Sequence, residues 1–215
     1  MAKHDPAKPS GPNEKYWDDY SNLQAVKHDL IRRYLNGWFP KLGYWAGRVV
    51  YLDTHAGRGK HAGGELGSPL VAVRTLLDHA HRDKLLEKSE FLFLLIEKDE
   101  ENCKALQAEI DALGALPKKV TVTAVHADAF ATIKQLVDHF KEKKQKIAPA
   151  FVFVDPYGFR IPGSILRELM KAGRVELFIN VMWRELDMAI MQKHRAAGLT
   201  ARLNEYFDGE EWAMA

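Results

Sequence analysis

The chain has 215 residues, of which 47% are hydrophobic and 28% are charged, and this composition predicts a globular protein with a sizeable core and excludes intrinsic disorder. Its apolar runs fall short of the roughly 18 residues of a membrane span, and its first residues lack the apolar segment of a signal peptide, so we expect a cytoplasmic protein that binds no membrane. A formal net charge of +2 does not by itself indicate nucleic acid, and the single cysteine, Cys103, excludes an internal disulfide.

The amino-terminal part predicts a polar segment followed by a helix. Residues 1–20 are rich in lysine and proline, and we expect them to form a flexible tail. Ser21 and Gln24 match a capping box, which predicts that a leading amphipathic helix spans 21–36. Its predicted apolar face comprises Leu23, Val26, Leu30, Ile31, Tyr34 and Leu35. We expect the helix to be closed by Gly37, Pro40 and Gly43.

The rest of the chain alternates between short apolar runs and amphipathic stretches. The apolar runs predict strands at 49–52, 91–96, 120–125, 150–154 and 175–181. Between and after these runs, helical patterns begin at Ser68, at about Asp99, after Asp128, at Pro162 and after Val181. This alternation predicts an α/β fold, in which a mostly parallel sheet carries helices on both faces and the leading helix is an amino-terminal extension. We expect one Rossmann-like domain over 21–207 and a carboxy-terminal end over 208–215.

The most informative stretch is the loop Asp53–Gly59, which directly follows the first predicted strand. Gly57 and Gly59 can adopt positive φ angles and let backbone N–H groups approach a ligand, although any tight turn can also use glycine. Asp53 stands before the glycines, where it can hold the amino group of a methionine moiety, whereas the dinucleotide fingerprint places its acidic residue about 20 residues later. S-adenosylmethionine is therefore the first cofactor candidate. A nicotinamide cofactor ranks last, because Ala62 stands where that fingerprint has its third glycine.

Acidic residues stand at the ends of four predicted strands: Asp53, Glu97, Asp128 and Asp155. In a parallel sheet these ends share one edge, and ligands of such sheets bind there. On a methyltransferase sheet, Asp53 would serve the methionine end of the cofactor and Glu97 its ribose hydroxyls. Asp128 would contact the adenine amino group, and Asp155 would face the methyl acceptor. Capping of the next helix is the alternative role for Glu97 and Asp128.

The segment after the fourth strand, Asp155-Pro156-Tyr157, is the candidate catalytic motif. Asp155 can accept a hydrogen bond from an amino group and raise its nucleophilicity, while Tyr157 can stack on a flat acceptor such as a base. The alternative is that Asp155 and Pro156 only begin a turn in which Tyr157 packs. We expect no metal, because His55 and His61, which flank the glycine loop, lack the additional ligands of a zinc site.

The loop Asp53–Gly59, the following Gly63–Pro69 and the motif Asp155–Gly158 resemble the three-Cys-motif partner proteins, called TcmP, and the resemblance extends over most of the chain. A more distant similarity links the Asp-Thr-His-Ala-Gly loop to the RlmJ-type enzymes, which methylate adenine N6 in ribosomal RNA. The resemblance implies a Rossmann-type methyltransferase fold with S-adenosylmethionine as cofactor, and it places His55 in the cofactor loop. It also implies that the leading helix lies near the cofactor, which makes Lys27 a candidate cofactor-binding residue. A protein with a three-cysteine motif is the implied partner.

Two features depart from these families. The N6-adenine enzymes usually read Asp-Pro-Pro-Tyr or Asn-Pro-Pro-Tyr, whereas here Tyr157 comes one residue early and Gly158 follows. Such sheets also commonly finish with an antiparallel pair of strands, yet the sequence after Val181 is mainly helical, so we expect 208–215 to be the end of a fragment. The predicted function is S-adenosylmethionine-dependent methyl transfer to a nucleobase amino group in RNA or DNA. The alternative is a non-catalytic, methyltransferase-like partner of the three-cysteine protein.

Overall fold

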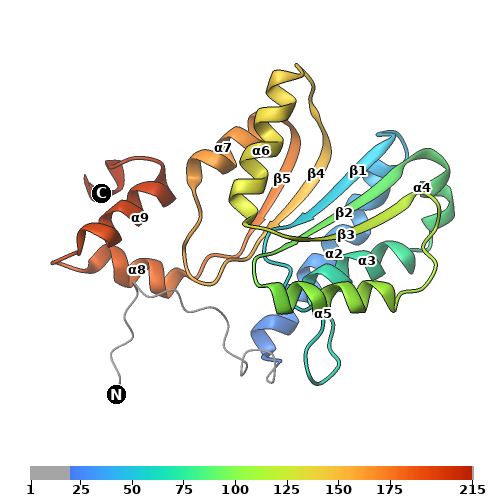
Figure 1. The fold of residues 1–215 in the computed structure, drawn as a ribbon, viewed down its shortest axis with the longest axis horizontal. Helices are drawn as coiled ribbons and strands as arrows, with labels where there is room; N and C mark the ends of the chain where they lie inside the picture. Colours follow the sequence, from blue (N-terminus) through green and yellow to red (C-terminus); the bar gives the residue numbers. More distant parts are fainter. Residues whose placement is uncertain (1–19, 215) are drawn as a thin grey trace.

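The structure is a computed structural model that describes residues 20–214, so the predicted flexible tail, except for Tyr20, lies outside the described residues. Its centre is a five-stranded sheet (Figure 1). All neighbouring strands run parallel, in the order β3-β2-β1-β4-β5. The strands are β1 (Arg48–Asp53), β2 (Glu90–Glu97), β3 (Val120–His126), β4 (Ile147–Val154) and β5 (Gly173–Ile179).

The strand order identifies the fold. From β1 the chain moves outward to β2 and β3 on one side, then returns to place β4 and β5 on the other side, as in doubly wound Rossmann-like sheets. The predicted α/β, Rossmann-like fold is confirmed. β1 and β4 lie side by side, with Asp53 paired to Phe153. The order reverses between these two strands, so the loops that follow them meet at the point where such sheets bind ligands.

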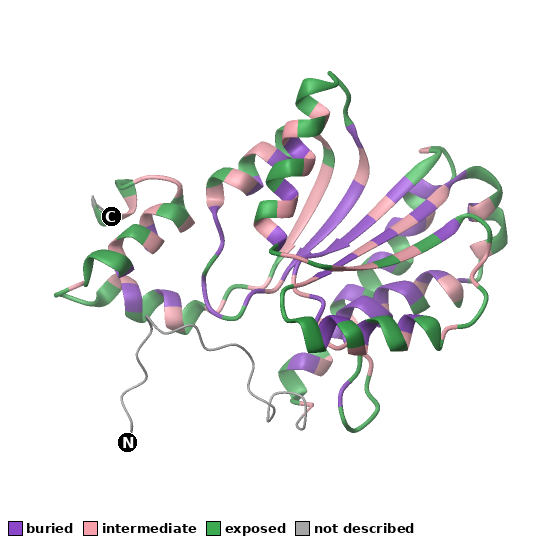
Figure 2. Cartoon of the chain, in the orientation of Figure 1, coloured by how far each residue is buried: buried purple, intermediate pink, exposed green. Residues whose placement is uncertain are grey.

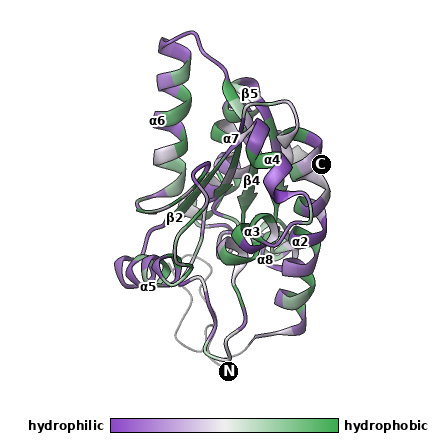
Figure 3. Ribbon diagram, turned by 90° about the vertical axis from the view of Figure 1, so that its right-hand side faces the viewer, coloured by the Kyte–Doolittle hydropathy of each residue, from purple (hydrophilic) through white to green (hydrophobic). Residues whose placement is uncertain are grey.

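Helices cover both faces of the sheet, as Figures 1 and 2 show. One core contains side chains from α2 (Asn22–Gly43), α3 (Ser68–Leu77), α4 (Arg82–Lys88) and α5 (Glu100–Asp111), and the other contains side chains from α6 (Ala129–Glu142) and α7 (Gly163–Lys171). Phe151 and Phe153 of β4 belong to the first core, and Val152 and Val154 belong to the second. Because both faces are covered, the interior strands β2 and β4 are largely apolar, which is visible in Figure 3, whereas the edge strands β3 and β5 also carry polar residues.

Three helical segments follow β5: α8 (Trp183–Met191), α9 (Ala197–Phe207) and the 3-10 helix η1 (Glu211–Met214). Leu186 of α8 and Leu203 of α9 pack with Phe159 from the loop after β4, which makes a third, small core. In Figure 1 these helices lie to one side of the sheet, beyond α7. The helical sequence predicted after the fifth strand is confirmed, and β5 is an edge strand of the sheet within residues 20–214.

The leading helix is longer than predicted. The sequence predicts 21–36, but α2 continues through Pro40 to Gly43. Proline has no N–H, so it leaves the carbonyl of Asn36, four residues earlier, without its helical donor. The ring Nε2 of His79 lies 3.0 Å from that carbonyl oxygen and supplies the missing hydrogen bond. A side chain from a later segment therefore permits the helix to pass the proline.

The buried face of α2 also differs from the prediction. Ile31 and Leu35 are buried as expected, but Leu23, Val26, Leu30 and Tyr34 are exposed. The buried face comprises Gln24, His28, Ile31, Leu35, Trp38, Phe39, Leu42 and Gly43. The aromatic pair near the end of the helix decides this orientation, because Trp38 packs against Phe151 and Phe39 packs against Phe91. The predicted capping box of Ser21 and Gln24 is confirmed.

Three further local features differ from the predictions. Gly67 rather than Ser68 is the N-cap of α3. The short helix α4 was not predicted, since seven residues with only Leu85 buried show no clear apolar period. Strand β5 ends before Asn180, whose side chain turns into the site described below. No helix within residues 20–214 combines the length and the apolar character needed to span a membrane.

Candidate functional site

The loop after β1 begins as an extension of the sheet. The N–H of Thr54 donates to the carbonyl of Phe153 on β4 at 3.0 Å, and the N–H of Ala56 donates to the carbonyl of Ile96 on β2 at 2.9 Å. The loop is therefore fixed to both neighbouring strands before it turns. This places the following glycines directly at the switch point of the sheet.

Gly57 and Gly59 then turn the backbone with φ angles of 65° and 81°. These left-handed conformations were anticipated from the sequence, and residues with a Cβ atom adopt them rarely. A Cβ atom at Gly59 would also lie 2.9 Å from Cδ1 of Leu106 on α5. The loop thus needs glycine at position 59 both for its backbone conformation and for its close approach to α5.

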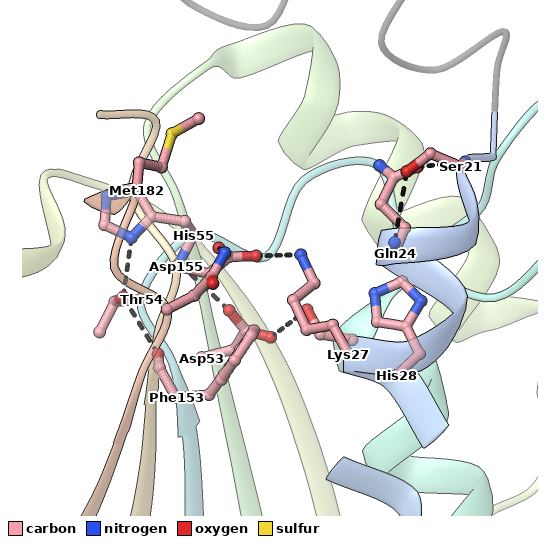
Figure 4. Close-up of polar contacts among 12 residues, drawn as sticks. Ser21, Gln24, Lys27, His28, Asp53, Thr54, His55, Phe153, Asp155 and Met182 are labelled. Atoms are coloured by element: carbon pink, nitrogen blue, oxygen red, sulfur yellow. Dashed lines mark hydrogen bonds and ion pairs between the residues drawn. The ribbon is translucent and has the colours of Figure 1, made fainter. Parts of the chain in front are cut away.

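Asp53 is fully buried at the end of β1, beneath the loop (Figure 4). Its carboxylate accepts hydrogen bonds from the hydroxyls of Ser68 at 2.7 Å and Tyr51 at 3.2 Å, and from the N–H of His55 at 3.1 Å. Burial raises the pKa of this carboxyl to about 7, although the three hydrogen bonds act in the opposite direction. Asp53 therefore fixes the start of the loop and the start of α3 by hydrogen bonds from inside the protein. Its contact with a methionine amino group stays a prediction.

Glu97, at the end of β2, turns its carboxylate to the glycine loop. It accepts the N–H of Gly57 on Oε2 and the N–H of Asp99 on Oε1, each at 2.8 Å. Each carboxylate oxygen has two lone pairs, so both can accept a further donor such as a ribose hydroxyl. The N-cap of α5 is Asp99, which accepts the N–H of Asn102 at 2.9 Å. The alternative in which Glu97 caps this helix is not observed.

Asp128 caps α6, as the alternative interpretation of this residue predicted. Its carboxylate accepts the N–H of Ala131 at 3.1 Å and pairs with Nζ of Lys98 at 3.0 Å. The hydrogen bond from Ala131 is the main reason why the pKa of Asp128 is lowered, and the Lys98 ammonium adds to it. Because the side chain is 47% exposed, the cap leaves it accessible to a ligand. Its contact with adenine stays a prediction.

His55 connects the glycine loop to the segment after β3. Its ring centroid lies 5.9 Å from that of Phe130, and its Nδ1 lies 2.7 Å from the hydroxyl of Thr54. Burial lowers the pKa of His55 to about 4, so the imidazole is neutral at neutral pH. A neutral, partly buried ring beside a phenylalanine suits a flat, uncharged ligand group better than a phosphate.

Asp155 follows β4 and is held by two side chains from other parts of the chain (Figure 4). Lys27 of α2 forms an ion pair with Oδ2, and the amide of Asn180 donates to Oδ1 at 2.7 Å. The ion pair is mostly buried, since the two side chains are 13% and 15% exposed. Lys27 therefore lies beside the candidate catalytic residue, and its contact with a cofactor stays a prediction.

The remainder of the fourth-strand motif presents an aromatic ring to solvent. Pro156 is buried, but Tyr157 is 44% exposed, so the alternative in which this ring packs inside the turn is not observed. Gly158 has a φ angle of 85°, and its N–H lies 3.1 Å from the sulfur of Met182. This contact joins the loop after β4 to the segment after β5.

Several residues of the site were not singled out from the sequence. Asn180 could have been found, since it is a polar residue at a strand end like the four acids. His61 was noted from the sequence only as flanking the glycine loop, and its meeting with Tyr20 and His28 was not predicted: the Tyr20 hydroxyl lies 3.0 Å from Nδ1 of His28, and the rings of Tyr20 and His61 are 5.0 Å apart. Burial, together with the adjacent charge of Lys27, lowers the pKa of His28 to about 4. Among the residues that the structure describes, no group of three or more metal-ligating side chains is present.

Comparisons with known proteins return distant structural similarities. No family model matches the chain, and no curated protein does. Among solved structures, YhhF from Escherichia coli, described as a candidate methyltransferase, shares 20% identity over 70% of this chain and 67% of its own, with a TM-score of 0.42. HI0767 from Haemophilus influenzae, described as a candidate methylase, shares 16% identity over 66% of this chain and 65% of its own, with a TM-score of 0.40. The fold assignment above depends on the strand order and not on these similarities.

Proposed function

We propose that the chain is an S-adenosylmethionine-dependent methyltransferase that acts on a nucleobase amino group in RNA or DNA. One observation carries the proposal: a glycine loop with two left-handed residues and the carboxylate of Asp155 follow the adjacent strands β1 and β4 at the switch point of the sheet. A cofactor loop and an acceptor for an amino hydrogen thus stand next to each other. This is the arrangement that methyl transfer to an amino group requires.

The residues around the loop fit the parts of the proposed cofactor. Gly57 and Gly59 hold left-handed backbone conformations, which fits a loop whose N–H groups approach a ligand. The carboxylate of Glu97, oriented by two backbone N–H groups, suits the ribose hydroxyls. Neutral His55, with the accessible carboxylate of Asp128, suits the adenine and its amino group. The ammonium of Lys27 and the carboxylate of Asp53 are assigned to the methionine end.

The chemistry assigned to the protein is positioning and hydrogen bonding. S-adenosylmethionine supplies the methyl group from its sulfonium centre. Asp155 accepts a hydrogen bond from the acceptor amino group, which orients the nitrogen lone pair and increases its nucleophilicity. In the transfer, the S–C bond of the sulfonium would break as the N–C bond forms, S-adenosylhomocysteine would leave, and Asp155 would stabilise the positive charge on the nitrogen until its proton passes to solvent. Asn180 and Lys27 hold the carboxylate in place, and Tyr157 stacks on the base.

Binding is tested first by isothermal titration of the chain with S-adenosylmethionine and S-adenosylhomocysteine, with NAD as the control. We expect both adenosyl ligands to bind and NAD not to bind. The second measurement is transfer of labelled methyl groups to total RNA and to DNA by the wild type and by Asp155→Asn. In this variant an amide replaces the carboxylate at similar volume. We expect unchanged binding of S-adenosylhomocysteine and a loss of transfer of about 100-fold or more.

The outcomes separate the proposal from its alternative. Folded protein that binds neither adenosyl ligand contradicts the cofactor assignment. Binding without transfer to RNA or DNA contradicts the acceptor assignment and favours a non-catalytic partner of a three-cysteine protein. Transfer by Asp155→Asn at the wild-type rate removes Asp155 from the mechanism.

A further inference from the structure

Two large aromatic side chains are exposed where the segments after β4 and β5 meet. Tyr157 is 44% exposed, and Trp183, the first residue of α8, is 66% exposed. Burial of a tryptophan side chain is strongly favourable, so an indole left mostly in water beside a candidate site indicates a surface that binds a ligand. Tyr157 already belongs to the proposed acceptor site, whereas Trp183 has no role in it.

The hydrogen bonds of the site bring Trp183 close to the acceptor position. Its neighbour Met182 accepts the N–H of Gly158, the residue after Tyr157. Three residues before Trp183, Asn180 donates to the carboxylate of Asp155 at 2.7 Å. Since a chain advances at most about 3.6 Å per residue, the Cα atom of Trp183 lies within about 11 Å of that of Asn180. The backbone at Trp183 therefore lies near the acceptor position, and its ring is 66% exposed.

The charges around the two rings are mixed. Arg160 and Arg184 are exposed, and neither forms an ion pair within residues 20–214. Glu185 and Asp187 lie on the same helix as Arg184, so this surface carries no strong positive field. Duplex binding depends mainly on neutralising many phosphates. Single-strand binding adds to phosphate contacts the stacking of bases on aromatic rings, a contribution that bases paired inside a duplex do not make.

We propose that Trp183 is a stacking subsite for the nucleotide next to the target base, with Arg184 contacting the neighbouring phosphate. The inference rests on the proposed function and names its substrate class as single-stranded nucleic acid, because a base within a duplex cannot stack on a protein ring. Tyr157 then stacks on the target base and Trp183 on its neighbour. The two rings hold the strand across the carboxylate of Asp155.

The test measures binding of fluorescently labelled 12-nucleotide RNA and DNA strands, which contain adenine and cytosine, in the presence of S-adenosylhomocysteine. The same strands annealed to their complements serve as duplex probes. We expect the wild type to prefer the single strands and Trp183→Ala to bind them on the order of 5- to 150-fold more weakly. Trp183→Phe should restore most of the affinity. Arg184→Gln should reduce the slope of log affinity against log salt by about 0.7.

Trp45→Ala is the matched control. Trp45 is 55% exposed, so it resembles Trp183, but it lies before β1 at the opposite edge of the sheet, where Arg174 packs on its ring. We expect this variant to bind the strands like the wild type. Affinity for S-adenosylhomocysteine should be unchanged in all the variants, which shows that each one is folded.

Four results would overturn the inference. They are Trp183→Ala binding within twofold of the wild type, a preference for the duplex, no binding of any oligonucleotide, and methyl transfer to polypeptide in place of nucleic acid. Where S-adenosylhomocysteine still binds, these results leave the cofactor part of the proposed function standing. Failure of S-adenosylhomocysteine itself to bind contradicts the proposed function, and this separates the two failures.

Discussion

The two halves of the sheet hold their strand-end carboxylates in different ways. In the first half, each carboxylate accepts at least one backbone N–H in addition to any side-chain donors: His55 donates to Asp53, Gly57 to Glu97 and Ala131 to Asp128. In the second half, the side chains of Lys27 and Asn180 bind Asp155. A carboxylate bound by backbone fixes the conformation of a loop, whereas side chains can move away without disturbing the backbone. The first half is therefore suited to the preformed cofactor loop that we propose, and the second to the proposed acceptor site, where only side chains hold the carboxylate.

The largest expected effect concerns the ion pair that joins α2 to Asp155. Lys27→Met leaves the carboxylate of Asp155 mostly buried without its counter-charge, and we expect a loss of about 3 kcal/mol in the free energy of unfolding. The double variant Lys27→Met with Asp155→Asn removes both charges and should recover most of this loss. Urea denaturation of the wild type, both single variants and the double variant measures the coupling.

The ion pair of Lys98 and Asp128, in the first half of the sheet, is the control for these Lys27 and Asp155 variants. Its side chains are 78% and 47% exposed, so Lys98→Met should cost less than about 1 kcal/mol. Equal costs for Lys27→Met and Lys98→Met would contradict the distinction between the two halves of the sheet.

A second prediction concerns the pH dependence caused by Asp53. Its folded pKa of about 7 lies above the usual 3.8, so between these values the folded state holds a proton that the unfolded chain has lost, and stability falls as the pH rises. Asp53→Asn should remove this loss. Relative to the wild type, the free energy of unfolding of the variant should increase by on the order of a few kcal/mol between pH 4 and pH 7, with no further increase above pH 7.

His28 and His55 act with the opposite sign in the same window. Their folded pKa values of about 4 lie below the usual 6.5, so they reduce stability as the pH falls from 6.5 to 4. The contribution of the Asp53 carboxyl is therefore obtained as the difference in the free energy of unfolding between Asp53→Asn and the wild type at each pH. Denaturant midpoints across this pH range measure that difference. A difference that does not change with pH would show that Asp53 is ionised in the folded protein.

A third prediction concerns the glycine loop. Gly59→Ala forces a Cβ atom into a left-handed conformation and against Leu106, so we expect a loss of about 2 kcal/mol in stability and weaker binding of S-adenosylhomocysteine. Gly37→Ala is the matched control, because an added Cβ atom within α2 meets nothing within 4 Å. That variant should gain about 0.5 to 1 kcal/mol and bind as the wild type does. Thermal unfolding and titration measure the two effects.

The smallest expected effect separates the two roles of Asp128. Asp128→Ala should lose about 1 kcal/mol because it removes the N-cap of α6, while Asp128→Ser keeps a capping oxygen and nearly all the stability. Both variants lose the carboxylate proposed to contact adenine. We therefore expect both to bind S-adenosylhomocysteine more weakly. Unchanged affinity in Asp128→Ser would leave the cap as the only role of this residue.

The sequence by itself determined the order of the strands and the loop that follows the first of them. Continuous apolar runs mark strands buried on both faces, and Gly57 and Gly59 mark a left-handed turn, since both signals are contained in a few consecutive residues. The positions of Glu97 and Asp155 at one sheet edge followed from parallel topology alone.

Tertiary structure decided the features that depend on contacts between distant segments. His79 completes the hydrogen bonding that lets α2 pass Pro40, and the packing of Trp38 on Phe151 selects the buried face of that helix. The meeting of Lys27 with Asp155 likewise joins residues 128 positions apart. No local pattern could predict these contacts, because each one depends on how the helix packs on the completed sheet and not on the residues next to it in the chain.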